Sequence, residues 1–238
     1  MTVTSFDVQV LLARLFSSMV RIILKPMILY LIRHGKTDAH LENRKQSPAT
    51  PLGEFGKKQA EALADKMNLS KIDHLYSSDW PRAIQTAEYL SRKLKLEVKT
   101  HPLVHEIQKH PDLNDVPEES EIGQRCRRES LKNKDNFDWK FDDQGESLNE
   151  VIARAKKVIG FLEREHPNDT VAIVSHEIFM TVMTTLILLG PNFDKKTFLK
   201  VSWSLKIHNT GVNSFIYDPE TKYWTMTCFN DHGHLENE

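Results

Sequence analysis

Short apolar runs alternate with longer segments of helical periodicity along the chain from residue 27 onwards. Runs with the composition of buried strands lie at 27–32, 72–78, 96–101 and 170–175. Apolar spacing predicts helices over 53–68, 80–95, 147–166 and 178–190. Two final segments, VNSFIYD and YWTMTCFN, are separated by PETK and predict a hairpin. Strands that are apolar on both faces and alternate with helices predict an α/β fold, a three-layer sandwich with a mostly parallel central sheet flanked by helices.

Local signals support three of these helices. Pro81 stands in the first turn of the helix over 80–95, where its missing N–H costs nothing. Ser147 and Glu150 have the spacing of a capping box at the start of the helix over 147–166. Gly190 closes the helix that begins at residue 178, whose Met and Leu residues we expect in the core.

The first 26 residues depart from the alternating pattern. They are apolar and basic, but Arg14 and Arg21 interrupt them, so they lack the ~18 uninterrupted apolar residues of a membrane-spanning helix. They also lack the basic start and small-residue cleavage site of a secretory signal. We therefore interpret 1–26 as an extension packed on the domain or as a start codon assigned too early, with a membrane-surface helix as the alternative. The catalytic domain is predicted over 27–238.

A second irregular segment covers 105–146, which is polar and charged with scattered Trp and Phe. A loop of this length inside a compact domain usually folds as a lid or carries function. We expect it to be a lid-like insertion that determines specificity. Within it, RCRRES (125–130) is interpreted as a solvated helix face.

Composition narrows the class of partner. The 238 residues contain 32 Lys plus Arg and 33 Asp plus Glu, so no overall charge favours nucleic acid or an acidic surface. Cys126 and Cys228 lie far apart without metal-ligand spacing, which argues against a disulfide framework or a zinc site and favours a reducing cytoplasm. We expect no metal, no stable membrane insertion and a small-molecule substrate. Assembly as a homodimer is left open.

Polar side chains gather where the predicted parallel strands end. The first strand is followed by Arg33 and His34, and the fourth by His176. Arg82 begins the helix after the second strand. Because ligands bind beyond the carboxyl ends of parallel strands, these groups are expected to converge on one site. Two guanidinium groups and two imidazoles favour a compact dianion such as phosphate.

The same residues suggest a reaction. A neutral imidazole can attack phosphorus, and phosphoryl transfer needs chiefly positioning and charge stabilisation. Attack by His34 gives a phosphohistidine, and a nearby acid must protonate the departing alkoxide. Glu106, just after the third strand, is the candidate favoured by its position over the carboxylates of the 105–146 segment. To act as an acid near neutral pH, this carboxyl needs burial or the negative charge of the phosphate beside it.

Six sequence blocks in order resemble the histidine phosphatase superfamily, the phosphoglycerate-mutase-like enzymes. They are LIRHGKT (31–37), PLGEFGKKQAEAL (51–63), SSDWPRAIQTA (77–87), HPLVHEI (101–107), GES (145–147) and VAIVSH (171–176). The resemblance implies that His34 is the phosphorylated nucleophile and Glu106 the proton donor. It implies a phosphate clamp made by Arg33, Arg82 and His176. It also implies that hydrolysis needs no metal and no organic cofactor.

The sequence departs from the family pattern at several positions. His40 stands where an Asn often helps to bind phosphate, and Gln46 keeps the spacing of another phosphate contact, so both are candidate phosphate ligands. Glu177 replaces the usual Gly after the second histidine and could repel phosphate if it pointed inward.

The characteristic residues of the mutase subgroup after the acid are absent. This favours a phosphatase acting on a small phosphomonoester, with water as the final acceptor. The alternatives are a phosphoglycerate mutase and a catalytically weak anion-binding or interaction module.

Overall fold

The computed structural model describes residues 25–66, 72–190 and 193–235. The extension predicted over 1–26 lies outside the described residues except for its last two, and so do the last two residues of the helix predicted over 53–68. Every structural statement below concerns the described part of the chain.

One mixed six-stranded sheet forms the centre of the domain, with the order β3-β2-β4-β1-β5-β6. The strands are β1 Met27–Arg33, β2 His74–Ser77, β3 Val98–Thr100, β4 Thr170–Ser175, β5 Val212–Asp218 and β6 Tyr223–Asp231. The strands β3, β2, β4 and β1 are mutually parallel, whereas β5 pairs antiparallel with both β1 and β6. The mostly parallel sheet and the hairpin at its edge are both confirmed.

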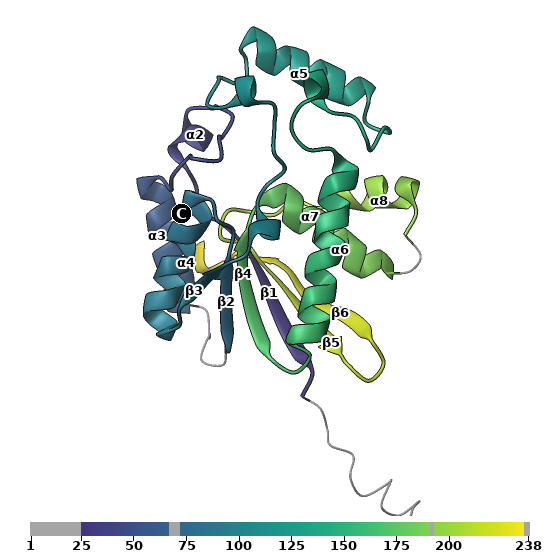
Figure 1. Ribbon diagram of the computed structural model, residues 1–238. Coiled ribbons are helices and arrows are strands. Elements are labelled where there is room, and N and C mark those ends of the chain that lie inside the picture. The colour runs from purple at the N-terminus through teal and green to yellow at the C-terminus, as the bar shows by residue number, and fades with distance from the viewer. Residues whose placement is uncertain (1–24, 67–71, 191–192, 236–238) are drawn as a thin grey trace, which may run out of the picture.

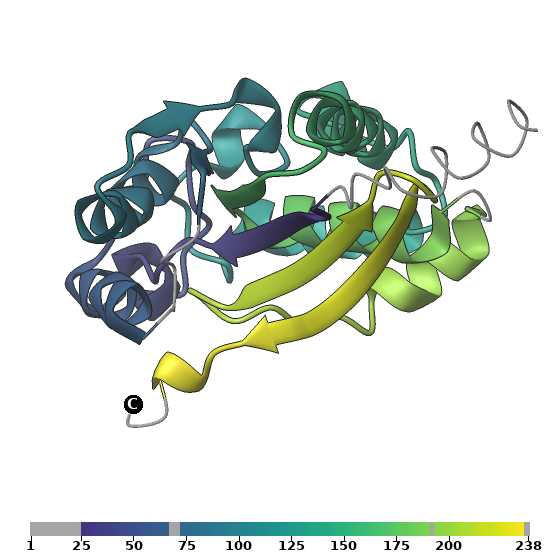
Figure 2. The same cartoon turned by 90° about the horizontal axis from the view of Figure 1, so that it is seen from below.

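Helices cover both faces of this sheet, which confirms the three-layer sandwich (Figure 2). On one face lie α3 Glu54–Lys66 and α4 Pro81–Leu94, and on the other α6 Leu148–Glu165, α7 Glu177–Leu189 and α8 Lys195–Ser202. The helix α8 was not predicted, because its eight residues are too few to show a clear period. Asp194 caps it by accepting a hydrogen bond from the Thr197 N–H.

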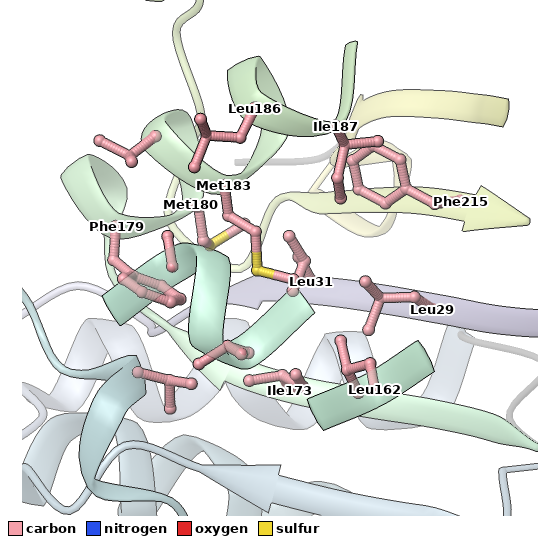
Figure 3. Packing of buried hydrophobic residues seen from close by; sticks show 14 of the residues in the cluster. Leu29, Leu31, Leu162, Ile173, Phe179, Met180, Met183, Leu186, Ile187 and Phe215 are labelled. Carbon is pink, nitrogen blue, oxygen red and sulfur yellow. The ribbon is translucent and has the colours of Figure 1, made fainter. Parts of the chain in front are cut away.

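The larger core lies between α6, α7 and the sheet. Figure 3 shows Phe179, Met180 and Met183 of α7 packed toward Leu31 of β1 and Ile173 of β4. All five side chains are almost fully buried. The apolar residues of this helix are therefore core, as predicted, and their packing fixes the point at which the chain leaves β4 and enters α7.

The segment 105–146 contains one real helix, α5 Glu121–Lys132, and two short 3₁₀ turns. Only Gly123 of α5 is buried, in agreement with the predicted solvated face. Figure 1 shows α5, with the short α2 Asp38–Leu41, beyond the carboxyl ends of β1 and β4. A bridge between Arg44 and Pro117 joins this segment to the loop after α2. Its action as a lid stays a prediction.

Two glycines allow the loop after β1 to approach α3 closely. A Cβ on Gly35 would lie 2.5 Å from the carbonyl oxygen of Gly56, and a Cβ on Gly56 would collide with the Lys36 carbonyl. Neither position has room for a larger residue. The glycine after His34 therefore serves the packing of this loop against α3.

The described residues include no helix that is long and apolar enough to cross a membrane.

Candidate active site

The carboxyl ends of β1, β2 and β4 bring together the four residues expected to form the site. His34 contacts two of the others. Its ring centroid lies 5.0 Å from that of His176, and its Nε2 accepts a hydrogen bond from Arg82 Nε at 3.2 Å. A cavity of about 270 Å³ opens above them, lined by Arg33, His34 and Arg82 among others. The convergence expected from the strand ends is present in the structure.

The tautomer of His34 is fixed by its neighbour. Its Nδ1 lies 2.7 Å from the Gly35 carbonyl oxygen, which can only accept, so Nδ1 carries the proton. The ring is 3% exposed, and burial together with the charges of Arg82, His176 and Arg33 holds the pKa of His34 well below its usual value. The imidazole is therefore neutral at physiological pH, and its unprotonated Nε2 can act as a nucleophile once an incoming anion takes over the hydrogen bond from Arg82.

Arg82 is held rigidly beside this nitrogen. Its guanidinium donates from Nη1 to the Ser47 carbonyl at 2.9 Å and stacks on the Trp80 ring at 4.6 Å from the centroid. Burial is the main cause that lowers the pKa of Arg82 to about 10, so the group still carries its charge near neutrality. A buried, oriented cation next to a neutral nucleophile favours an incoming anion.

His176 lies behind His34 and is not among the residues that line the cavity. It is fully buried, with Nε2 2.9 Å from Ser78 Oγ and with Nδ1 lacking any partner in the described residues. Burial, followed by the charges of Arg82 and its other neighbours, holds its pKa well below the usual value. Its predicted direct contact with phosphate stays a prediction.

Arg33 is paired with a carboxylate in the unliganded site. Its Nη2 lies 2.7 Å from Oε2 of Glu177, and its Nη1 donates to the Ile207 carbonyl at 2.5 Å. The Nε of Arg33 is buried without a partner in the described part of the chain. Glu177 does point toward the cavity, but it neutralises Arg33. A phosphate that binds Arg33 through Nη2 must displace this carboxylate.

Several nitrogen donors meet at His40. Thr37 N–H donates to His40 Nδ1 at 3.1 Å, so the neutral ring carries its proton on Nε2. That Nε2 lies 2.9 Å from Nε2 of Gln46 and 3.5 Å from Nη2 of Arg33. If the Gln46 amide is turned over, its oxygen accepts the hydrogen bond from His40 Nε2. With the amide as it stands, a bound oxyanion would accept hydrogen bonds from His40, Gln46 and Arg33 together. The structure thus places both candidate phosphate ligands beside Arg33.

Glu106 lies at the amino end of α7. Its Oε1 accepts hydrogen bonds from the N–H groups of Ile107 at 3.0 Å and Phe179 at 3.2 Å, and its Oε2 accepts from Ile178 at 3.1 Å. The carboxyl group lines the same cavity as His34. The Oε1 lone pairs are both used, whereas Oε2 retains one free site, so Oε2 is the position for a transferable proton.

Sequence reasoning missed the residues that hold these groups in place. Arg154 of α6 donates to the carbonyls of Leu103 and His105, both at 2.8 Å, and pairs with Glu146 at 2.7 Å, which fixes the segment leading into Glu106. Asn209 donates to the His34 carbonyl at 2.9 Å. The buried position of Arg154 on its helix was a usable signal, since a charge on the apolar face of a helix requires a partner.

The buried neutral histidines predict a pH-dependent stability. Burial and the nearby cations lower the pKa of His40 to about 4, whereas the unfolded ring titrates near 6.5. Between these values the unfolded chain binds more protons, so the free energy of unfolding falls as the pH falls from 6.5 to about 4. Replacing His40 with Asn is expected to reduce this slope by at most one proton, ~1.4 kcal/mol per pH unit. Urea unfolding over this range measures it, and parallel slopes for both proteins would contradict it.

The comparisons with known proteins agree with this geometry. The family model of the histidine phosphatase superfamily (branch 1) matches residues 29–232. The chain belongs to the histidine phosphatase superfamily. The resemblance found from the sequence blocks is thereby confirmed.

Curated relatives include both mutases and a phosphatase. A probable phosphoglycerate mutase of Proteus mirabilis is 26% identical over 213 residues, covering 87% of this chain and 94% of that protein. A phosphoserine phosphatase of Hydrogenobacter thermophilus is 31% identical over 169 residues, covering 70% of this chain and 78% of that protein. The relatives therefore define the family without deciding between the two reactions.

Solved structures share the fold. A phosphoserine phosphatase from Entamoeba histolytica, solved with phosphoserine, superposes with a TM-score of 0.71 at 24% identity, covering 88% of this chain and 99% of that chain. A mycobacterial glucosyl-3-phosphoglycerate phosphatase solved with inorganic phosphate gives a TM-score of 0.71 at 22% identity, covering 87% of this chain and 98% of that one. These matches establish the same architecture.

Proposed function

We propose that this protein is a metal-independent phosphatase that hydrolyses a small phosphomonoester through a phosphohistidine on His34. The observation that carries the proposal is the buried His34 ring, whose proton is held on Nδ1 by the Gly35 carbonyl and whose Nε2 faces Arg82. A neutral nucleophilic nitrogen beside a fixed guanidinium is what in-line attack on a phosphoryl group requires.

The first step transfers the phosphoryl group to the protein. Nε2 of His34 bonds to phosphorus while the ester P–O bond breaks, and Arg82 stabilises the charge on the equatorial oxygens. The departing alkoxide takes a proton from Oε2 of Glu106.

The second step returns the protein to its starting state. Water attacks the phosphohistidine, the resulting carboxylate of Glu106 takes a proton from that water, and the P–N bond breaks to release inorganic phosphate. His34 regains its neutral ring with the proton still on Nδ1. No metal or organic cofactor takes part in either step as we propose them.

The positive charge at the rim of the cavity supports the proposal that the substrate is small and anionic. Lys109 lines it and has no ion-pair partner in the described residues, whereas the neighbouring Lys45 is paired with Glu118 at 2.7 Å. A free cation beside a phosphate site suits a second negative group on the substrate. One curated relative and one solved structure are phosphoserine phosphatases, which also supports a small, anionic substrate. We propose that 105–146, which supplies Lys109, acts as the lid and determines specificity.

We propose the reducing cytoplasm as the location, since Cys126 and Cys228 are free thiols that are partly accessible. An oxidising compartment would leave both exposed to oxidation.

The proposal is tested by assaying purified protein on p-nitrophenyl phosphate and on a panel of small phosphomonoesters, with and without EDTA. We expect phosphate release that the chelator does not affect. Interconversion of 2- and 3-phosphoglycerate without net phosphate release would favour the mutase instead. Absence of both reactions across the panel would favour an anion-binding module.

If Glu106 is the proton donor, the effect of replacing it should depend on how basic the leaving group is. Replacing Glu106 with Gln is expected to lower kcat/KM about 10²-fold for alkyl phosphates, because the alkoxide must then leave without a proton. p-Nitrophenolate is a stable anion and leaves unaided, so its kcat/KM should fall less than about tenfold. Glu118→Gln, at another carboxylate of the cavity, is the control, and it should change kcat/KM by the same factor for both kinds of ester. Equal losses for both kinds of ester would exclude Glu106 as the proton donor.

Glu177 is expected to compete with substrate for Arg33. In Glu177→Gln the guanidinium is no longer neutralised, and KM should fall about 3- to 10-fold with little change in kcat, in keeping with a half-exposed ion pair. Glu54→Gln, which breaks an exposed pair with Lys57 outside the cavity, should leave KM unchanged. A raised KM in Glu177→Gln would show instead that the carboxylate helps to bind substrate.

A further inference from the structure

A second cluster of polar side chains lies at the opposite end of the sheet from His34. His74 begins β2, His166 directly follows α6 as its C-cap residue, and Asp169 immediately precedes β4. Figure 1 shows the start of β2, the start of β4 and the last turn of α6 at the end of the sheet away from α2 and α5. With a rise of ~3.3 Å per residue, β4 separates this cluster from the phosphate site by about 20 Å. It therefore plays no part in the chemistry proposed for His34.

The three side chains each contribute one candidate ligand atom to a compact cluster. Oδ2 of Asp169 lies 3.2 Å from Nε2 of His74 and 2.9 Å from Nδ1 of His166, and all three atoms lie within 4.8 Å of one another. In a tetrahedral site with metal–ligand bonds of about 2.0–2.1 Å, neighbouring ligand atoms stand about 3.3 Å apart. Two of the three separations are already close to that value. Of the described residues, no other group of His, Cys, Asp and Glu has this arrangement.

The surroundings of the cluster suit a bound cation. The hydroxyl of Tyr76 lies 2.9 Å from Nε2 of His166, so its oxygen can accept a hydrogen bond from that N–H group when Nδ1 binds a metal. The His74 and His166 rings are held together, with centroids 4.4 Å apart. The side chain of His166 is 8% exposed, whereas those of His74 and Asp169 are 28% and 36% exposed, which leaves a path from solvent.

We propose that His74, His166 and Asp169 bind one Zn²⁺ ion, with water as the fourth ligand. Two imidazoles and one carboxylate form a donor set that suits zinc in tetrahedral geometry. The ion joins the start of β2 to the turn between α6 and β4, which are far apart in the sequence. Its effect is on stability and is independent of the proposed phosphatase reaction. The sequence-based argument against a zinc site rested on the spacing around Cys126 and Cys228 and did not consider these two histidines.

Zinc titration of the full-length, tag-free protein after EDTA treatment tests this site. By calorimetry, we expect one Zn²⁺ per chain, and at a hundredfold excess over Kd a rise of roughly 5–10 °C in the unfolding midpoint. Co²⁺ in place of Zn²⁺ should give the intense visible absorption bands of four-coordinate cobalt. Activity on p-nitrophenyl phosphate is measured alongside and should not depend on zinc.

Matched variants distinguish this cluster from other surface histidines. His74→Gln and Asp169→Asn should each abolish the stoichiometric binding and the thermal shift. His232→Gln removes one ring of the stacked pair with His208, at 4.3 Å between centroids, and should leave both unchanged. Circular dichroism checks that the variants fold, and the cobalt spectrum of the unmodified protein provides the test if they do not. No binding by the unmodified protein at 100-fold the protein concentration, or binding lost only in His232→Gln, would overturn the proposal.

Discussion

Replacing His34 with alanine is expected to reduce kcat/KM on any phosphomonoester by at least about 10⁴-fold. The variant loses the imidazole whose unprotonated Nε2 lies beside Arg82, so no covalent intermediate forms and water has to attack the ester directly. The remaining phosphate-binding groups leave KM or the inhibition constant of inorganic phosphate within about tenfold of the unmodified value. Steady-state kinetics on p-nitrophenyl phosphate measures both quantities.

His232→Ala, at an exposed histidine that does not line the cavity, provides the control for this experiment. It should retain full activity, because its ring stacks on the His208 ring and bonds the Asn230 carbonyl without lining the cavity. Activity in His34→Ala above about a tenth of the unmodified value would mean that another group or a water molecule is the nucleophile.

Replacing Arg82 with methionine is expected to lower kcat about 10³-fold. Methionine keeps much of the volume beside Trp80 but removes the charge that stabilises the transferring phosphoryl group and the donor that orients His34. The pKa of His34 should rise in this variant, because the charge of Arg82 is one cause of its depression. As the pH falls, the variant should therefore lose its remaining activity at a higher pH than the unmodified protein.

Arg92→Met on the same helix is the matched control. Arg92 stacks on Tyr89 at 4.3 Å from the centroid, as Arg82 does on Trp80, but it lies outside the cavity. The control should change neither kcat nor its pH dependence. An Arg82→Met protein that kept kcat within tenfold would show that Arg33 alone suffices to bind and activate the phosphoryl group.

The fold was largely predictable because its signals are local. The run TVAIVS is apolar at both faces, and such a strand is buried only when helices cover both sides of the sheet. The position of His34 and His176 after β1 and β4 then follows, since adjacent parallel strands end at the same edge. The helix α8 was not predicted because eight residues are too few to show whether the apolar positions follow a helical period.

The finer geometry of the site was not predictable from local pattern. Nothing near Glu177 in the sequence indicates that its carboxylate pairs with Arg33, because that contact depends on how α7 meets the end of β1. Two of the three N–H groups around Glu106, those of Ile178 and Phe179, depend in the same way on the amino end of α7. Long-range contacts of this kind arise only when the sheet is assembled.

Trapping the intermediate tests the central claim most directly. The unmodified protein is incubated with a ³²P-labelled phosphomonoester, quenched within one turnover and digested, and the labelled peptide is sequenced by mass spectrometry. We predict one phosphoryl group on His34 that is stable in base and labile in acid, and none in His34→Ala. A turnover-competent protein that carries no label, or that carries it on another residue, would contradict the account.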